Sequence, residues 1–319
     1  MQRILITGGA GFIGSYTAHM LLARGCQVHV LDNLSSGRIS NLGSEALRGG
    51  RIRFIEGDVR DLAALQTALA GCDPVLHLAA QVSVQRSVTD PLVSAGNNIM
   101  GFLNVLEAVR LQRVPRLVYA SSAAVFGAPD RLPVSEDSET HPVSPYGLEK
   151  LVNEQYAAVY GALYGVSSLG MRYFNVYGPL QDPDSPYAGV ISKFAAALDR
   201  DCELTVFGDG LQTRDFIYVG DVAQANVQAL TATCVGVLNV ATGSSASLLQ
   251  LVEPMGNAFG KAPQVRHVAA TVGDILHSAS TADGAGLDAR HAPGRRAAGP
   301  GRVAAAAFRQ SWRSAVTST

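Results

Sequence analysis

The chain has 319 residues, of which 47% are apolar and 16% charged, and its formal net charge at pH 7 is −1. This composition is typical of a globular protein, and the near-neutral charge gives no electrostatic reason to expect nucleic acid or a membrane as a partner. The four cysteines show no metal-ligand spacing, and no apolar run approaches the ~18 residues of a membrane-spanning helix. We therefore expect one large or two fused units in the cytoplasm, with free thiols, no metal site and no signal peptide.

Short apolar strands alternate with amphipathic helical patterns over residues 1–172, which is typical of a doubly wound parallel sheet. The predicted strands are 3–7, 27–32, 53–56, 74–78, 116–120 and 166–172. The predicted helices are 11–24, 61–70, 97–110 and 146–163. The sequence thus predicts a Rossmann-type α/β domain whose sheet is covered on both faces.

The pattern changes after Arg172. Residues 173–190 are rich in Pro, Gly, Tyr and Asn and are expected to form a loop. Predicted strands at 204–207, 216–219 and 237–240 then mix with helices near 190–199, 221–231 and 247–259. We expect residues 173–280 to form a smaller mixed α/β lobe. Residues 281–319 are biased toward Ala, Gly and Arg and predict a weakly packed tail, with a helix only at 303–312.

A glycine motif lies between the first predicted strand and the first predicted helix. Gly8, Gly11 and Gly14 have the spacing that allows a tight turn, close approach of a pyrophosphate and close helix–strand packing. The free N–H groups and the positive dipole at the helix start would bind the phosphates. Asp32 ends the second strand, where a carboxylate can accept hydrogen bonds from a ribose and repel the extra phosphate of NADP. The sequence therefore predicts NAD as the cofactor.

A second motif combines Ser122 with Tyr146 and Lys150. The tyrosine and the lysine are four residues apart and so share one helix face. A nearby ammonium and the positive nicotinamide ring both favour the phenolate, which makes Tyr146 a candidate general base, while Ser122 can bond the substrate oxygen. The same pair could also be a core aromatic residue and a solvated lysine, but the glycine motif upstream favours catalysis.

These motifs resemble those of the extended short-chain dehydrogenases/reductases, and most of all those of the UDP-hexose 4-epimerases. The resemblance covers residues 1 to about 278 and includes several further segments in order. They are 57–61 (GDVRD), 77–81 (HLAAQ), 97–99 (NNI), 119–127 (YASSAAVFG), 172–179 (RYFNVYGP), 208–210 (GDG) and 214–219 (RDFIYV).

The resemblance also implies binding residues, a fold with a UDP-sugar-binding lobe, and a homodimer formed by the helices at 97–110 and 146–163. The implied cofactor contacts are Gly8, Gly11, Phe12, Ile13, Gly14, Asp32, Asn33, Ser36, Gly37, Asp58, Val59, Leu78, Ala79, Ala80, Asn97, Tyr146, Lys150 and Phe174. The implied substrate contacts are Ser122, Tyr146, Asn175, Gly189, Val190, Phe207, Arg214 and Ser278. Arg214 also makes sense by itself, because a near-neutral protein needs a local cation to bind a diphosphate.

The implied reaction is NAD-dependent inversion at C4 of a UDP-hexose through a 4-keto sugar. Related 4,6-dehydratases and UDP-glucuronate decarboxylases carry acidic residues after the catalytic hydroxyl, whereas Ala123 and Ala124 follow Ser122 here. Methyl groups cannot transfer protons, so these reactions are disfavoured. Ser278 lies where a small residue would admit an N-acetyl group, which predicts acceptance of the N-acetylated pair as well.

A second hypothesis is an NAD-binding protein with impaired or lost epimerase activity. Thr271 stands where relatives carry a second diphosphate-binding arginine, and the altered tail replaces a packed end of the chain. Assaying turnover of UDP-sugars distinguishes the two hypotheses.

Overall fold

A computed structural model describes residues 2–183, 188–269 and 277–281. The chain divides into two compact units. The first unit comprises Met1–Gly127, Thr140–Tyr173 and Gly220–Leu238, and the second comprises Ala128–Glu139, Phe174–Val219 and Asn239–Thr319. Thr271 and residues 282–319, with the predicted helix at 303–312, lie outside the described residues.

The first unit is built on the seven-stranded sheet that the alternation of strands and helices predicts. Its strand order is β10-β6-β5-β4-β1-β2-β3, and the strand pairs from β6 to β3 are parallel. The strands are β1 (Arg3–Thr7), β2 (Gln27–Asp32), β3 (Ile52–Glu56), β4 (Val75–His77), β5 (Leu117–Ser122), β6 (Ser168–Tyr173) and β10 (Gly236–Val240). Strand β5 runs two residues further than predicted, so Ser122 is its last residue.

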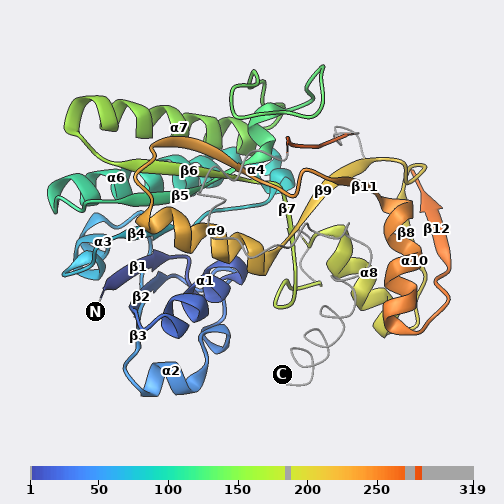
Figure 1. Cartoon of the computed structure of the whole chain (residues 1–319), viewed down its shortest axis with the longest axis horizontal. Helices are drawn as coiled ribbons and strands as arrows, with labels where there is room; N and C mark the ends of the chain where they lie inside the picture. The colour runs from blue at the N-terminus through green and yellow to red at the C-terminus, as the bar shows by residue number, and fades with distance from the viewer. Residues whose placement is uncertain (1, 184–187, 270–276, 282–319) are drawn as a thin grey trace. The chain divides into compact units, whose positions relative to one another are not determined.

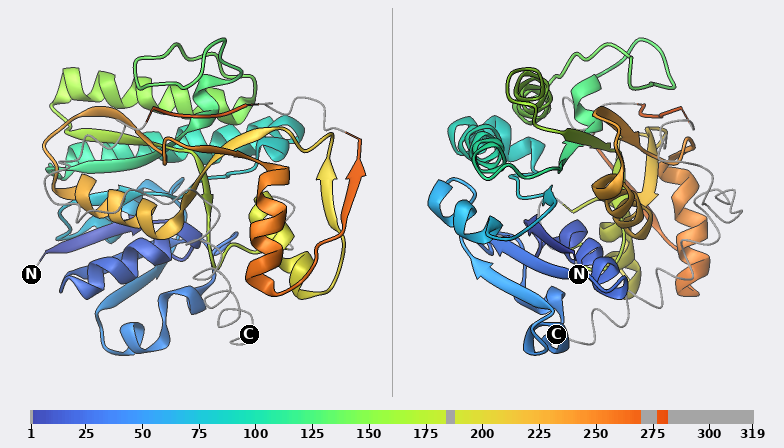
Figure 2. Two further views of the ribbon diagram at one scale, coloured as in Figure 1. Left: turned by 45° about the vertical axis from the view of Figure 1, so that its right-hand side comes forward. Right: turned by 60° about the vertical axis from the view of Figure 1, so that its left-hand side comes forward.

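Helices cover both faces of this sheet, as the apolar strands predict (Figures 1 and 2). Helices α3 (Leu62–Leu69), α6 (Gly101–Leu111) and α7 (Pro145–Tyr164) lie on one face, and α1 (Phe12–Ala23) and α9 (Val219–Thr231) lie on the other. Shorter elements are η1 (Ile39–Leu42), α2 (Ser44–Arg48), α4 (Val84–Thr89), α5 (Pro91–Ala95) and η3 (Ala123–Phe126). The predicted helix at 97–110 begins as a π-helical turn, η2 (Gly96–Met100).

Residues 220–238 belong to the first unit, although the sequence pattern assigned them to the smaller lobe. Two features bring them back to the sheet. Strand β10 extends the sheet beside β6, and Asn226 of α9 donates a hydrogen bond to Thr17 of α1 at 3.2 Å. This long-range pairing has no local sequence signal, which is why the sequence alone places the boundary differently.

The part of the second unit that the structure describes contains two small sheets and two helices. Strands β11 (Ser245–Ser247), β9 (Thr213–Tyr218) and β7 (Asn175–Tyr177) form one sheet, and β12 (Val265–Val268) pairs with β8 (Leu204–Phe207) in the other. Helices α8 (Val190–Asp199) and α10 (Leu248–Phe259) share its apolar core (Figure 2). Strand β7 corrects the prediction that residues 173–190 are all loop: three of these residues extend in parallel beside β9 because their backbone finds a partner there.

All four cysteines are free, as expected. Among the described residues, no group of three His, Cys, Asp or Glu side chains could hold a metal ion. Within the same ranges, no helix combines the length and the apolar character needed to cross a membrane.

Candidate functional site

The glycine motif forms a tight turn between β1 and α1. Gly8 has φ +70°, and a Cβ atom there would lie 2.6 Å from the backbone nitrogen of Ala79. A Cβ at Gly14 would lie 2.3 Å from the carbonyl oxygen of Gly8. The motif therefore needs glycine at both positions. Helix α1 begins after Gly11 without a side-chain cap, so its first N–H groups are available to an anion, as the sequence predicts.

Asp32 closes the same turn from strand β2. Its Oδ2 accepts a hydrogen bond from the Ala10 N–H at 2.9 Å, and its Oδ1 accepts one from the Leu34 N–H at 2.9 Å. Burial raises the pKa of this carboxyl, and the two backbone hydrogen bonds oppose the rise. A carboxylate has about four acceptor positions, so each oxygen retains capacity for a ribose hydroxyl.

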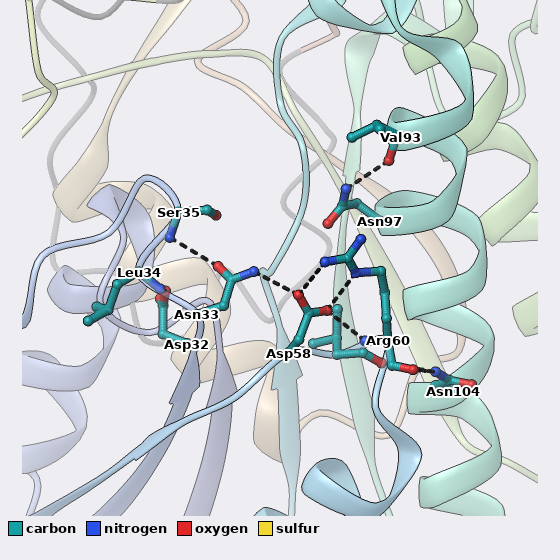
Figure 3. A network of polar contacts seen from close by, with 10 residues as sticks. Asp32, Asn33, Leu34, Ser35, Asp58, Arg60, Val93, Asn97 and Asn104 are labelled. Carbon is teal, nitrogen blue, oxygen red and sulfur yellow. Dashed lines mark hydrogen bonds and ion pairs between the residues drawn. The ribbon is translucent and has the colours of Figure 1, made fainter.

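A polar network joins the ends of β2 and β3 next to Asp32 (Figure 3). Asn33 donates to Asp58 at 2.9 Å and accepts from the Ser35 N–H at 3.1 Å. The Arg60 guanidinium bonds both carboxylate oxygens of Asp58, at 2.9 and 2.7 Å, and holds the pKa of Asp58 well below its usual range. The structure thus brings together three predicted residues, Asp32, Asn33 and Asp58, and adds Arg60, which the sequence analysis did not identify.

The other predicted cofactor residues of the first unit lie on neighbouring segments. Ser36 is exposed, whereas Gly37 is buried, and a Cβ at Gly37 would lie 2.8 Å from the carbonyl carbon of Ala10. Phe12 and Ile13 are half-buried in the first turn of α1, and Leu78, Ala79 and Ala80 are half-buried after β4. Val59 is buried in the apolar core beside them.

Helix α7 carries the predicted catalytic pair on its first two turns. Its start is encoded locally: Ser144 caps the helix by accepting a hydrogen bond from the Gly147 N–H at 3.1 Å, and Pro145 occupies the first helical position. Ser87 of α4 accepts a further hydrogen bond from the Tyr146 N–H at 3.1 Å. The helix thus begins at a fixed residue, immediately before Tyr146.

The structure brings Ser122, Tyr146 and Lys150 together. The Lys150 ammonium lies 5.8 Å from the centre of the Tyr146 ring and donates to the Ala120 carbonyl of β5 at 3.0 Å. Burial lowers the pKa of Lys150 to about 8, although the charges of Glu149 and Glu154 oppose this. Burial raises the pKa of Tyr146 to about 12, and a hydrogen bond from Ser122 opposes the rise. Burial thus opposes ionisation of the Tyr146 phenol, whereas the Ser122 hydrogen bond favours it.

A buried ion pair connects strand β6 with helix α7, which carries Tyr146 and Lys150. Arg172 bonds both carboxylate oxygens of Glu154, at 2.9 and 2.8 Å, and Ser121 donates to the same carboxylate at 2.5 Å. Both charged side chains are almost fully buried. Removing one partner of such a pair typically costs about 3–5 kcal/mol, so the pair fixes the ends of β5 and β6 relative to α7.

The amide predicted to contact the cofactor, Asn97 of η2, donates to the Val93 carbonyl of the preceding helix α5 at 2.7 Å. Its neighbour Asn98 is 1% exposed and bonds both Gln81 and Glu149. The sequence analysis did not identify Asn98 or Glu149. In the sequence they are marked only by lying next to Asn97 and Lys150. Whether a polar residue is buried is decided by the tertiary structure, so the sequence contains no further indication of their role.

In the second unit, Arg214 lies on β9, and two other predicted nucleotide-sugar contacts form hydrogen bonds with the residues on either side of it. The Asn175 amide donates to the Asp215 carbonyl at 3.3 Å, next to Arg214. The Ser278 N–H donates to the Thr213 carbonyl at 3.0 Å, on the other side of Arg214. Other predicted nucleotide-sugar contacts lie on other elements: Gly189 and Val190 begin α8, and Phe207 ends β8. Phe174, a predicted cofactor contact, is buried before β7.

Comparisons with known proteins show the family to which the chain is similar. A family model described as "NAD dependent epimerase/dehydratase family" matches residues 4–241. The UDP-glucose 4-epimerase of Mycolicibacterium smegmatis is 40% identical over 281 residues, which cover 87% of this chain and 89% of that protein.

Two solved structures extend the similarity over the whole chain. The UDP-N-acetylglucosamine 4-epimerase of Methanobrevibacter ruminantium, in complex with UDP-N-acetylmuramic acid, has a TM-score of 0.91 and 33% identity, and the alignment covers 100% of this chain and 99% of that one. The UDP-glucose 4-epimerase of Thermus thermophilus, in complex with NAD, has a TM-score of 0.86 and 36% identity, with 98% and 100% covered.

Proposed function

The chain belongs to the NAD dependent epimerase/dehydratase family, and we propose that it interconverts the two C4 epimers of a UDP-hexose, with NAD as its cofactor. The observation that carries the proposal is the group of half-buried Ser122 and Tyr146 with buried Lys150 in the same unit as the glycine turn. The similar proteins described above are UDP-sugar 4-epimerases, which supports the choice of reaction.

The residues around the glycine turn fit NAD. Gly8 and Gly14 leave no room for a side chain, and the free start of α1 offers N–H groups to a pyrophosphate. Asp32 would accept hydrogen bonds from the adenosine ribose, and Asp58, held by Asn33 and Arg60, would face the adenine. When bound, NAD supplies the hydride acceptor and donor for C4, and its charged ring favours the Tyr146 phenolate.

In this mechanism Tyr146 removes the proton of the sugar 4-hydroxyl, and later returns a proton to the 4-keto oxygen. Ser122 donates a hydrogen bond to the same oxygen. Lys150 is held against Ala120 and contributes positive charge beside the phenol ring, which stabilises its ionised form. The sugar must turn over between the two hydride transfers, so that its opposite face is attacked.

Dehydration is disfavoured for this chain. The residues after Ser122 are Ala123 and Ala124, which begin the short helix η3. Neither side chain can give or take a proton, whereas loss of water from a 4-keto sugar requires a further acid and base. This argument supports epimerisation over the dehydratase and decarboxylase reactions known among related enzymes.

We assign the nucleotide-sugar contacts to the second unit. Arg214 would bind the diphosphate, and Asn175 and the start of α8 would contact the same ligand. Ser278 would leave room for an N-acetyl group at C2. The UDP-N-acetylglucosamine 4-epimerase among the similar structures supports the inclusion of N-acetylated sugars.

The alternative is an NAD-binding protein with impaired turnover, which the threonine at position 271 favours. Incubation with UDP-glucose, UDP-galactose and their N-acetylated forms, followed by chromatographic separation, tests both hypotheses. We expect each sugar to give a mixture with its C4 epimer. Tight NAD binding without any product would favour the alternative.

We also propose that the chain forms a homodimer through α6 and α7. Tyr156, Val159 and Leu163 lie at three- and four-residue spacing on α7 and are 39%, 49% and 68% exposed, which is unusual for apolar side chains that share one helix face. Sedimentation of the parent chain should give a dimer mass, and V159E/L163E should give a monomer. A monomeric parent chain at micromolar concentration would contradict the proposal.

A further inference from the structure

Glu149 is a buried acidic residue that the proposed mechanism does not use. It lies between Tyr146 and Lys150 in the sequence and is 3% exposed. Its carboxylate accepts a hydrogen bond from Asn98 at 2.6 Å and one from Ser94 at 2.9 Å. Burying a carboxylate is costly unless several donors compensate for lost water, so this position has a specific arrangement around it.

Asn98 connects Glu149 with the segment that follows β4. Its Oδ1 accepts from the Gln81 N–H at 2.8 Å, and its Nδ2 donates to the Gln81 carbonyl at 2.9 Å. One side chain therefore pairs with both backbone groups of Gln81. Gln81 directly follows residues 78–80, and the backbone of Leu78 and Ala79 lies against Gly8 of the glycine turn.

Two further hydrogen bonds close the network. Asn153, one helical turn after Glu149, donates to the Asn98 carbonyl at 3.1 Å. The Gln81 side chain donates to Ser94 at 3.1 Å. Hydrogen bonds with Asn98 of η2 thus hold two successive turns of α7, at Glu149 and Asn153. Asn98 also connects η2 to Gln81, which follows the predicted cofactor contacts at 78–80.

The charge of Glu149 acts on both predicted catalytic groups. It raises the pKa of Lys150 and that of Tyr146. The other ionisable groups that interact with Lys150 are Glu154, which raises its pKa in the same direction, and His77, whose own pKa is lowered to about 3 by burial and by the lysine. Loss of the Glu149 charge should therefore lower the pKa of Tyr146 and of Lys150 together.

We propose that Glu149 is a positioning residue. Through Asn98 and Ser94 it holds helix α7, which carries Tyr146 and Lys150, in register with Gln81 and the predicted cofactor contacts at 78–80. The inference rests on the proposed function, since it assumes that residues 78–80 contact NAD. It concerns a residue outside both binding sites, which acts through its neighbours.

Two substitutions separate the hydrogen bonds of Glu149 from its charge. E149Q keeps an oxygen that accepts from Asn98 but removes the charge, whereas E149L removes both. By calorimetry on protein freed of nucleotide, we expect E149L to weaken NAD binding about 10-fold and E149Q to stay within about 3-fold of the parent chain. The control E107Q removes an acidic charge from α6, which bonds Arg110 and Tyr160, and should leave NAD affinity unchanged.

The pH dependence of kcat tests whether the charge of Glu149 raises the pKa of Tyr146 and of Lys150. E149Q should shift both the acid and the alkaline limb to lower pH by about 0.5–1 unit, a movement that loss of stability alone does not cause. If E149L does not fold, S94A serves instead: it removes two hydrogen bonds of the network, the one that Glu149 accepts and the one that the Gln81 side chain donates, and keeps the charge. NAD binding should then weaken about 3-fold without a shift of either limb.

Unchanged NAD affinity in E149L, or in S94A where E149L does not fold, would overturn the proposal. NAD affinity is measured without substrate, so this test remains decisive even if the parent chain turns over no UDP-sugar. Absence of UDP-sugar turnover by the parent chain would refute the proposed function. The role of Glu149 would then be decided by the measurement of NAD binding alone.

Discussion

The predicted catalytic side chains of the first unit and the predicted nucleotide-sugar contacts of the second differ in how the protein holds them. Lys150 is 3% exposed, and hydrogen bonds and buried charges fix the helix that carries it. In the second unit Arg214 and Ser278 are half-buried and Phe207 is 46% exposed. Ser122 and Tyr146 are half-buried as well, so the difference lies in the buried hydrogen bonds and charges that hold the helix of the first set and in the exposed Phe207 of the second.

This difference predicts separable effects of substitution. Changes at the buried groups of the first unit should alter the chemical step or the binding of the cofactor. Changes at the half-buried groups of the second unit should alter substrate affinity and leave the chemical step largely intact.

The largest effect is expected for Y146F. The ring remains, but the group that accepts the proton is lost, so kcat should fall by ~10²–10⁴-fold while NAD stays bound. Product formation and calorimetry measure the two quantities. The control Y156F changes an exposed tyrosine of the same helix and should leave kcat unchanged. Turnover of Y146F within a few-fold of the parent chain would remove Tyr146 from the mechanism.

The next largest effect is expected for R214L. Loss of the guanidinium should raise the KM for a UDP-sugar by ~10–100-fold with a small change in kcat, because a charge-assisted hydrogen bond contributes about 1.5–3 kcal/mol. R266L is the matched control, since Arg266 is exposed on β12 and its pair with Glu203 is long, at 3.8 Å. A fall in kcat at unchanged KM would contradict the division between the two units.

A smaller effect is expected for D32A. The variant loses the acceptor for the ribose and the charge that repels a 2′-phosphate, so NAD affinity should fall about 10-fold and the preference for NAD over NADP should narrow. Calorimetry with both nucleotides measures this, and E45A, which removes an exposed charge from α2, is the control. Tighter binding of NADP by the parent chain would refute the ribose argument.

The smallest effect is a change of selectivity in S278Y. A tyrosine at this position should exclude a 2-N-acetyl group and lower kcat/KM for the N-acetylated pair about 10-fold relative to UDP-glucose and UDP-galactose. Competition assays with mixed substrates measure the ratio directly. Equal loss for both pairs would show that Ser278 does not act on the C2 substituent.

The sequence by itself predicted the doubly wound sheet, most of the helices and the positions of the glycine turn and of Ser122, Tyr146 and Lys150. These features have local causes: apolar periodicity, a capping serine followed by proline, and glycines where a Cβ would collide with backbone. Their signals therefore lie within a few residues of each feature and can be identified without any knowledge of the fold.

Only the tertiary structure decided which polar residues are buried and which segments pair at long range. In the structure, residues 220–238 belong to the first unit, and β7 pairs with β9. Asn98 donates a hydrogen bond to Glu149, which is 51 positions away in the sequence. The tertiary structure also placed the Tyr146 phenol where burial raises its pKa to about 12. Hydrogen bonding and desolvation depend on neighbours that are distant in sequence, and no local pattern encodes them.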